Sequence, residues 1–145
     1  MKSKIVSVLL VCILVFSTCA CGGSGDGEDG SSTEKHIYDS ASVVDVMNGV
    51  GTEKIGECSV IEAKSTDITD EVLEDWYFNY VEQNDFNYCV IVYTDANDNS
   101  GVFTNGSFVE KGATLEKQDD GSYMLADSDN AITYWVVDGH LKASN

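Results

Sequence analysis

Three oxygen-bearing side chains alternate along one polar segment, namely Asp95, Asn97 and Asn99. Alternate spacing turns successive carboxylate and amide oxygens toward one point, as in a calcium loop of the D-x-[DN]-x-[DN]-G type. The rest of that pattern fails, because Gly101 comes one place late and Gly106 occupies the position of the bidentate glutamate. These departures exclude an EF-hand. A looser Ca²⁺ loop between strands remains open, beside an ordinary turn rich in Asn and Asp.

Cys58 and Cys89 are the two cysteines in the part of the chain that has a folding pattern, and each lies in a predicted strand. If these strands are neighbours, a disulfide is geometrically possible outside the cytoplasm. Closing a loop of about 30 residues would stabilise the fold by roughly 3–4 kcal/mol. The alternative is a pair of small buried hydrophobic residues.

No motif identifies a catalytic residue. His36 and His140 are the only histidines, and the chain has no H-x-x-H, G-x-S-x-G or C-x-x-C. A hydrolase built from dispersed carboxylates stays open, because acid and base groups need only meet in space. Most aromatic residues follow buried periodicities, so only Phe78 and Trp135 are candidates for surface contacts. For Phe78, which falls among polar residues, packing under a neighbouring loop is an equal alternative.

The N-terminus is typical of an export signal. Lys2 and Lys4 precede the apolar run Ile5–Phe16, and small residues follow it. The run is too short for a spanning helix, which needs about 18–20 apolar residues.

The segment Thr18-Cys19-Ala20-Cys21 resembles the lipobox of bacterial lipoproteins, in which a small residue precedes a cysteine. The resemblance covers only the signal region, and Thr18 stands where an aliphatic residue is usual. It implies that Cys21, rather than its rival Cys19, carries a diacylglyceryl thioether and becomes the mature N-terminus. Two acyl chains would then hold the protein on the extracytoplasmic face of a membrane.

The charge excludes nucleic acid as a partner. All 25 acidic residues follow Cys21, six basic residues accompany them, and arginine is absent, so the mature chain carries about −19. Nucleic-acid binding depends on Lys and Arg contacts to phosphate. High net charge also keeps a surface protein soluble, and it favours cationic partners or metal ions.

The sequence predicts three parts: a signal peptide over residues 1–20, a flexible acidic Gly/Ser tether over 21–35, and one folded domain over 36–145. Within the domain, a short helix is expected in His36–Gly51, ended at Asn48-Gly49. A strand is expected over Lys54–Lys64.

The clearest helix is predicted from Asp70 to Gln83, capped by Thr69, with negative charge in its first turn. One broad apolar face follows the i, i+4 spacing, and it comprises Val72, Leu73, Trp76, Tyr77, Tyr80 and Val81.

From Phe86 onward the period changes to that of strands. Phe86–Thr94 is apolar on both faces, as in a central strand. Shorter strands follow, separated by Asn105-Gly106 and Asp119-Asp120-Gly121, and Ile132–Val137 is the last long strand, closed by Asp138-Gly139.

This order predicts an α+β domain with one long helix on a mainly antiparallel, curved sheet of about five to six strands. The outline is similar to cystatin-like and NTF2-like domains, an analogy of fold that implies no function.

The expected function is a lipid-anchored, non-catalytic binding or accessory module for an envelope protein, peptide or glycan, without a required cofactor. The alternatives are the small hydrolase and a calcium-stabilised adhesion or sensor domain.

Overall fold

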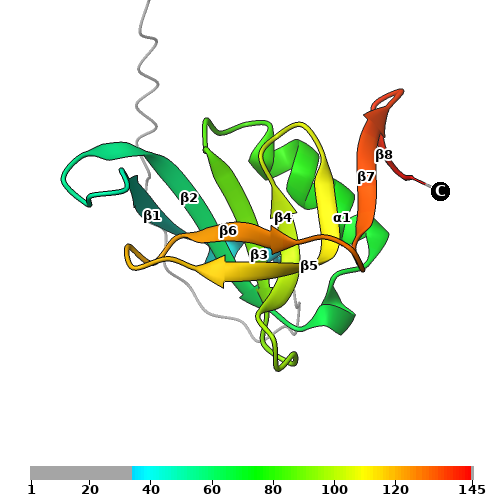
Figure 1. Ribbon diagram of the computed structural model, residues 1–145. Helices are drawn as coiled ribbons and strands as arrows, with labels where there is room; N and C mark the ends of the chain where they lie inside the picture. Colours follow the sequence, from blue (N-terminus) through cyan, green and yellow to red (C-terminus); the bar gives the residue numbers. More distant parts are fainter. Residues whose placement is uncertain (1–33, 145) are drawn as a thin grey trace, which may run out of the picture. The chain divides into compact units, whose positions relative to one another are not determined.

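The computed structural model describes residues 34–144, which form a sheet with one short helical segment against it (Figure 1). The predicted signal peptide, Cys21 with its predicted acylation and nearly all of the predicted tether lie outside the described residues. Within residues 34–144, no helix has the length and hydropathy needed to cross a membrane.

The strands join into one sheet of eight strands, in the order β1-β2-β3-β4-β5-β7-β8. The remaining strand, β6, pairs with the second half of β5, whereas β7 pairs with the first half. All pairs are antiparallel except β2 and β3. The strands are β1 Ser42–Met47, β2 Lys54–Ala63, β3 Tyr88–Tyr93, β4 Ser100–Thr104, β5 Val109–Lys117, β6 Tyr123–Asp127, β7 Ile132–Val137 and β8 His140–Ala143.

The crossover between the parallel strands β2 and β3 contains the helical segment. It consists of η2 Ser65–Asp67, α1 Asp70–Trp76 and η3 Tyr77–Val81, in which the last turn widens to π geometry. Thr69 caps α1, since its hydroxyl accepts a hydrogen bond from Val72 N at 3.3 Å. The cap and the acidic first turn are therefore confirmed.

The predicted apolar face of the helix is also confirmed, because it packs on the sheet. Leu73, Trp76 and Tyr77 are fully or almost fully buried there. They contact residues from β2, β3, β4, β5 and β7 in the larger of two hydrophobic clusters. Tyr77 additionally donates a hydrogen bond at 2.7 Å to the carbonyl oxygen of Gly106, which ties the helix to the turn between β4 and β5.

The face of the sheet opposite the helix is covered by the hairpin of β5 and β6, which belongs to the same sheet. β5 has a bulge at Gly112, whose φ is +87°, and its second half pairs with β6. The β5–β6 hairpin crosses in front of β2, β3 and β4 (Figure 1). Leu115 and Tyr123 from this hairpin pack with Cys58, Val90 and other residues in the smaller cluster. The central strand β3 is therefore buried on both faces, as its sequence predicted.

Two of the predictions about elements were wrong. The expected helix in His36–Gly51 is instead a 3-10 turn, η1 Ile37–Ser40, followed by strand β1. Three valines in this segment explain the outcome, because β-branched side chains lose rotamer freedom in a helix and pack well on a pleated strand.

The second error concerns the size of the elements. The sheet has eight strands rather than five to six, and the helix, α1 continued by η3, is short, at 12 residues. The segment Asp138-Gly139 closes the last long strand, but it is also the two-residue turn of a further hairpin to the short strand β8. Both residues have positive φ, +56° and +76°, as a type I′ turn between β7 and β8 requires.

Candidate functional site

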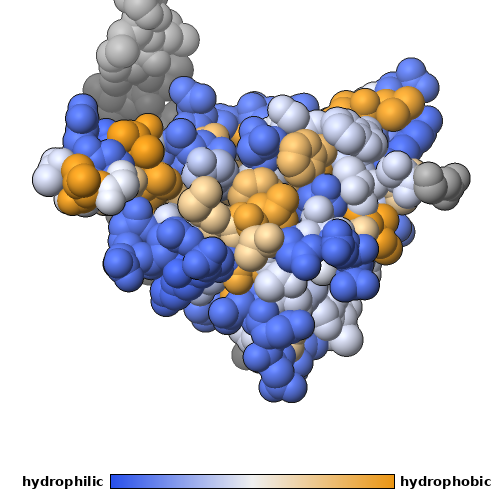
Figure 2. Space-filling view, in the orientation of Figure 1, coloured by the Kyte–Doolittle hydropathy of each residue, from blue (hydrophilic) through white to orange (hydrophobic). Residues whose placement is uncertain are grey.

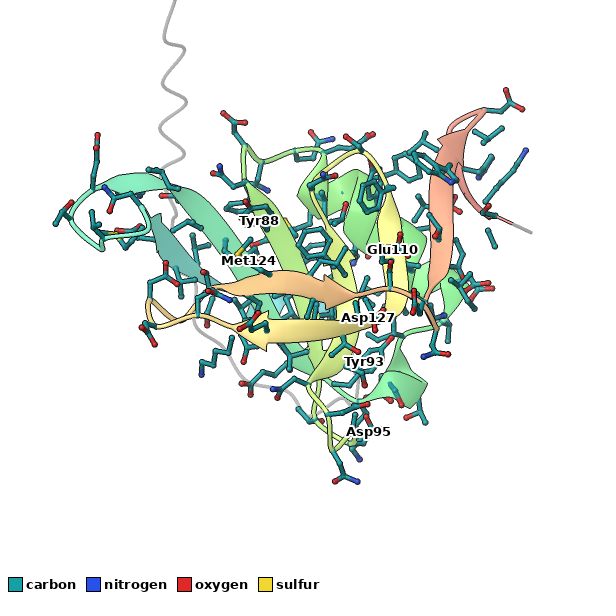
Figure 3. The ribbon with its side chains drawn as sticks, in the orientation of Figure 1. Tyr88, Tyr93, Asp95, Glu110, Met124 and Asp127 are labelled. Atoms are coloured by element: carbon teal, nitrogen blue, oxygen red, sulfur yellow. The ribbon has the colours of Figure 1, made fainter. Side chains whose placement is uncertain are left out.

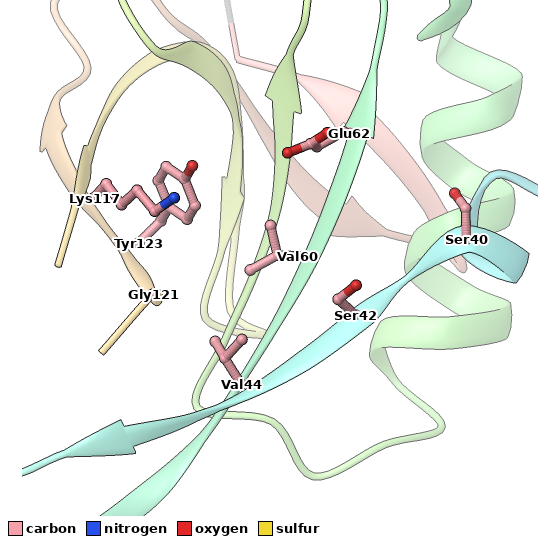
Figure 4. Close-up of a pocket in the computed structure, with 8 residues that line it drawn as sticks. All are labelled: Ser40, Ser42, Val44, Val60, Glu62, Lys117, Gly121 and Tyr123. Carbon is pink, nitrogen blue, oxygen red and sulfur yellow. The ribbon is translucent and has the colours of Figure 1, made fainter. Parts of the chain in front are cut away.

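A cleft lies on the face of the sheet opposite the helix, between β1–β2 and the β5–β6 hairpin (Figure 4). Its volume is about 440 Å³. We call it the sheet cleft, and its lining includes Ser42, Val44, Val60, Glu62, Lys117 and Tyr123. Pockets of about 300–1,000 Å³ with an apolar surface and a few polar groups are typical of small-ligand sites.

The strand alternation explains this lining. Ser42 pairs with Val60 across the β1–β2 ladder, and side chains two residues apart along a strand share a face. Val44 and Val60 therefore form an apolar floor, with Ser42 and Glu62 on the same side. The opposite wall is the hairpin, which contributes the Tyr123 ring and the Lys117 ammonium group.

Asp120 fixes the hairpin wall in place. One of its carboxylate oxygens accepts a hydrogen bond from Met47 N of β1 at 2.9 Å. The other accepts from the backbone N–H and the hydroxyl of Ser122, at 2.9 and 2.6 Å. These hydrogen bonds hold the pKa of Asp120 below its ordinary value. Asp120 therefore forms a clamp, a set of hydrogen bonds that fixes the turn of the β5–β6 hairpin to the end of β1.

A second candidate surface is the β7–β8 hairpin. Of the eight large hydrophobic side chains that are well exposed within residues 34–144, four belong to β7: Ile132, Trp135, Val136 and Val137, each 40–48% exposed. Figure 2 shows apolar surface on this projecting hairpin. Trp135 lies beside Phe108, with ring centroids 5.8 Å apart.

β8 ends the sheet, since it pairs only with β7 among the described strands. Its outer edge therefore offers unpaired backbone N–H and C=O groups, which is the feature that recruits another strand. Trp135 is 48% exposed, and its role as a surface contact stays a prediction. Phe78, the other predicted contact residue, is half-buried and packs against the larger cluster, edge-on to Tyr77.

No family model, curated protein or solved structure matches the chain. The function is therefore inferred from the sheet cleft, the β7–β8 hairpin and the polar and thiol groups of the domain.

The structure uses Asp95 for a backbone contact (Figure 3). Its two carboxylate oxygens accept hydrogen bonds from the backbone N–H and the hydroxyl of Ser65, each at 2.8 Å, and these bonds lower its pKa. Asn99 adopts a φ of +51° in the loop before β4. Among residues 34–144, no three His, Cys, Asp or Glu side chains group as metal ligands. Calcium binding by Asp95, Asn97 and Asn99 stays a prediction, and Ser65 would compete with the ion.

The two cysteines lie on adjacent strands but on opposite faces of the sheet. The parallel register sets Ser59 against Cys89 and Cys58 against Tyr88. Cys89 belongs to the cluster under the helix, whereas Cys58 belongs to the cluster under the hairpin. Both are buried free thiols. A disulfide needs two Cβ atoms that face each other, and this register does not provide them.

Burial should make both thiols unreactive. It raises the pKa of Cys58, and it raises the pKa of Cys89 to about 12, because the thiolate is desolvated there. We expect iodoacetamide at pH 8 to leave both unlabelled in the native protein and to label both in denaturant, as measured by peptide mass spectrometry. Rapid native labelling of Cys89 would contradict the burial described here.

Each histidine meets one carboxylate on the helix. His36 Nδ1 lies 2.8 Å from Asp75 Oδ2, and His140 Nδ1 lies 2.7 Å from Glu74 Oε1. His36 also stacks on Tyr38, which stacks on Tyr80. These pairs attach the start of the domain and the β7–β8 hairpin to the helix.

The hydrogen bond to Asp75 raises the pKa of His36 above its ordinary value of 6.5. The contribution of this His36–Asp75 pair to the stability of the fold is therefore complete below pH 6.5, and it is lost as the pH rises through the folded-state pKa of His36. We expect an NMR titration to place the His36 pKa above 6.5, and the Asp75→Asn variant to lower it. Asp98→Asn, which changes an exposed carboxylate in the loop between β3 and β4, should leave the His36 pKa unchanged. An equal response to both variants would contradict the pairing.

Sequence reasoning did not single out the cleft residues Glu62, Lys117 and Tyr123. They come from strands far apart in the chain, and their meeting depends on the bulge at Gly112. The sole local signal is that Lys117 is one of few cations in an acidic chain.

Proposed function

We propose that the chain is a membrane-anchored, extracytoplasmic lipoprotein that acts as a non-catalytic binding or accessory module. Acylation at Cys21 would retain it, and the tether would hold the domain off the membrane. The partner we propose is an extended segment of an envelope protein or peptide. The cystatin-like and NTF2-like analogy adds no support.

The observation that carries this proposal is the concentration of exposed apolar side chains on β7. Trp135 and Val137 alternate with Val136, so apolar surface lies on both faces of the hairpin. Exposed apolar side chains that gather on one element are more typical of interaction sites than apolar residues scattered singly over a surface. Because β8 is also an open edge, an added strand would gain backbone hydrogen bonds from β8 and side-chain contacts from β7.

Site-specific photocrosslinking in the native envelope tests the proposal. A benzophenone amino acid at Val137 should give one dominant protein adduct, identified by affinity capture and mass spectrometry. The same probe at Val50, which is 78% exposed but distant from the hairpin in the sequence, is the matched control. Equal adducts at both positions, or none at Val137, would count against the hairpin as the contact surface.

Anchoring has a separate test. Cys21→Ser should release the domain from the membrane fraction, whereas Cys19→Ser should not. Retention of the Cys21→Ser protein would contradict acylation at that residue. Substrate turnover that is lost on changing a single carboxylate or histidine would overturn the non-catalytic assignment.

A further inference from the structure

We propose that the sheet cleft is a second binding site, separate from the β7–β8 hairpin, and that it takes a short peptide by its two free termini. Glu62 and Lys117 stand on opposite walls of the cleft (Figure 4). Within residues 34–144 neither forms an ion pair. The Glu62 carboxylate would receive the ammonium group of the peptide, and Lys117 would receive its carboxylate.

Lys117 is one of three lysines within residues 34–144, with Lys35 and Lys64, that form no ion pair. Lys54, Lys111 and Lys142 each contact a carboxylate within 4 Å. Lys117 instead holds its ammonium nitrogen 5.8 Å from the centroid of the Tyr123 ring. A ring face orients a cation while leaving its N–H groups available, and a carboxylate ligand forms charge-assisted hydrogen bonds with such donors.

The arrangement of charges favours a peptide over a single amino acid. In an α-amino acid both charged groups are attached to the same carbon atom, whereas Glu62 and Lys117 stand on opposite walls, so a longer ligand suits the cleft better. A peptide of two or three residues separates its termini by about 3.3–3.6 Å for each residue. Its middle would lie on Val44 and Val60 and against the Tyr123 ring, which suits small apolar side chains. The clamp at Asp120 keeps this geometry in place before binding, which lowers the entropy cost of association.

Calorimetric titration of the full chain with trialanine tests the proposal. We expect saturable binding with a Kd below about 1 mM. N-acetyl-trialanine and trialanine amide, which each lack one terminal charge, should bind roughly tenfold more weakly, because each loses a charge-assisted hydrogen bond.

Two variants assign each terminus to its residue. Lys117→Gln should weaken trialanine binding roughly tenfold and abolish the further penalty of amidation. Glu62→Gln should do the same for acetylation. Lys64→Gln and Glu116→Gln are the matched controls, because both residues are exposed and neither lines the cleft. Circular dichroism melts should confirm that all four variants are folded.

Three results would overturn the inference: no saturable binding of trialanine, equal binding of the blocked peptides, or equal effects of the cleft and control variants. Loss of the hairpin crosslink would leave this site unaffected, since the two surfaces use different strands.

Discussion

We expect Gly101→Ala to destabilise the domain by about 3 kcal/mol, the upper end of the usual cost of overpacking. Gly101 lies on β4 opposite Val92 of β3. A Cβ atom at this position would stand 2.1 Å from the carbonyl oxygen of Ile91 and 2.8 Å from a methyl carbon of Leu115. The first contact is with the backbone of the central strand, so rotation of a side chain cannot relieve it, and β3 and β4 must separate.

Thermal unfolding followed by circular dichroism measures this effect. A loss of about 3 kcal/mol should lower the Tm by more than about 10 °C in a domain of this size. Gly49→Ala is the matched control, because an added Cβ meets nothing within 4 Å there and the backbone has no positive φ. It should change stability by no more than about 0.5 kcal/mol. Similar melting curves for the two variants would show that β3 and β4 are not packed as described.

Trp76→Ala should cost about 3–5 kcal/mol, because it removes the largest fully buried side chain and leaves a cavity under the helix. For a domain with a total stability of about 5–15 kcal/mol, such a loss brings the folded state close to its limit. Denaturant titration monitored by far-UV circular dichroism is the suitable measurement, since the substitution also changes the fluorescence.

Trp76→Phe gives the informative comparison. Within the described chain the indole N–H of Trp76 has no hydrogen-bond partner. Phenylalanine removes this unpaired buried donor and keeps most of the ring, so we expect a loss of only about 1 kcal/mol. Tyr77→Phe should cost at least as much, because it leaves the Gly106 carbonyl without the hydroxyl that now donates to it. A large loss for Trp76→Phe alone would indicate that the indole N–H has a partner.

Local patterns were sufficient for the elements with one strong signal. Thr69 and the acidic residues after it marked the start of α1, and apolar residues on both faces marked β3 as central. The same rules failed where two signals competed. In Ser42–Met47 an apolar spacing that suits a helix was outweighed by the preference of valine for strands, and the Asp138-Gly139 turn was taken as an end instead of a connection.

The two surfaces depend on information that no single segment contains. Trp135 was placed on the surface from its sequence, but the open edge beside it requires β8, which was not predicted. The sheet cleft requires the bulge at Gly112 and the contact between Asp120 and Met47, which are 73 residues apart. Long-range pairing of this kind has no local periodicity. The presence of Glu62 and Lys117 in one cleft could therefore not be recognised before the fold was known.

The opposite orientation of Cys58 and Cys89 has a consequence for how the protein matures. If the chain is exported, as we propose, and is still unfolded when it crosses the membrane, its thiols would meet an oxidising space before the sheet exists. A bond formed at that moment would join side chains that belong to different faces, and the parallel register of β2 and β3 could not then form. Folding and oxidation would then compete kinetically, and burial of the two thiols in the finished sheet would end that competition in favour of the native state.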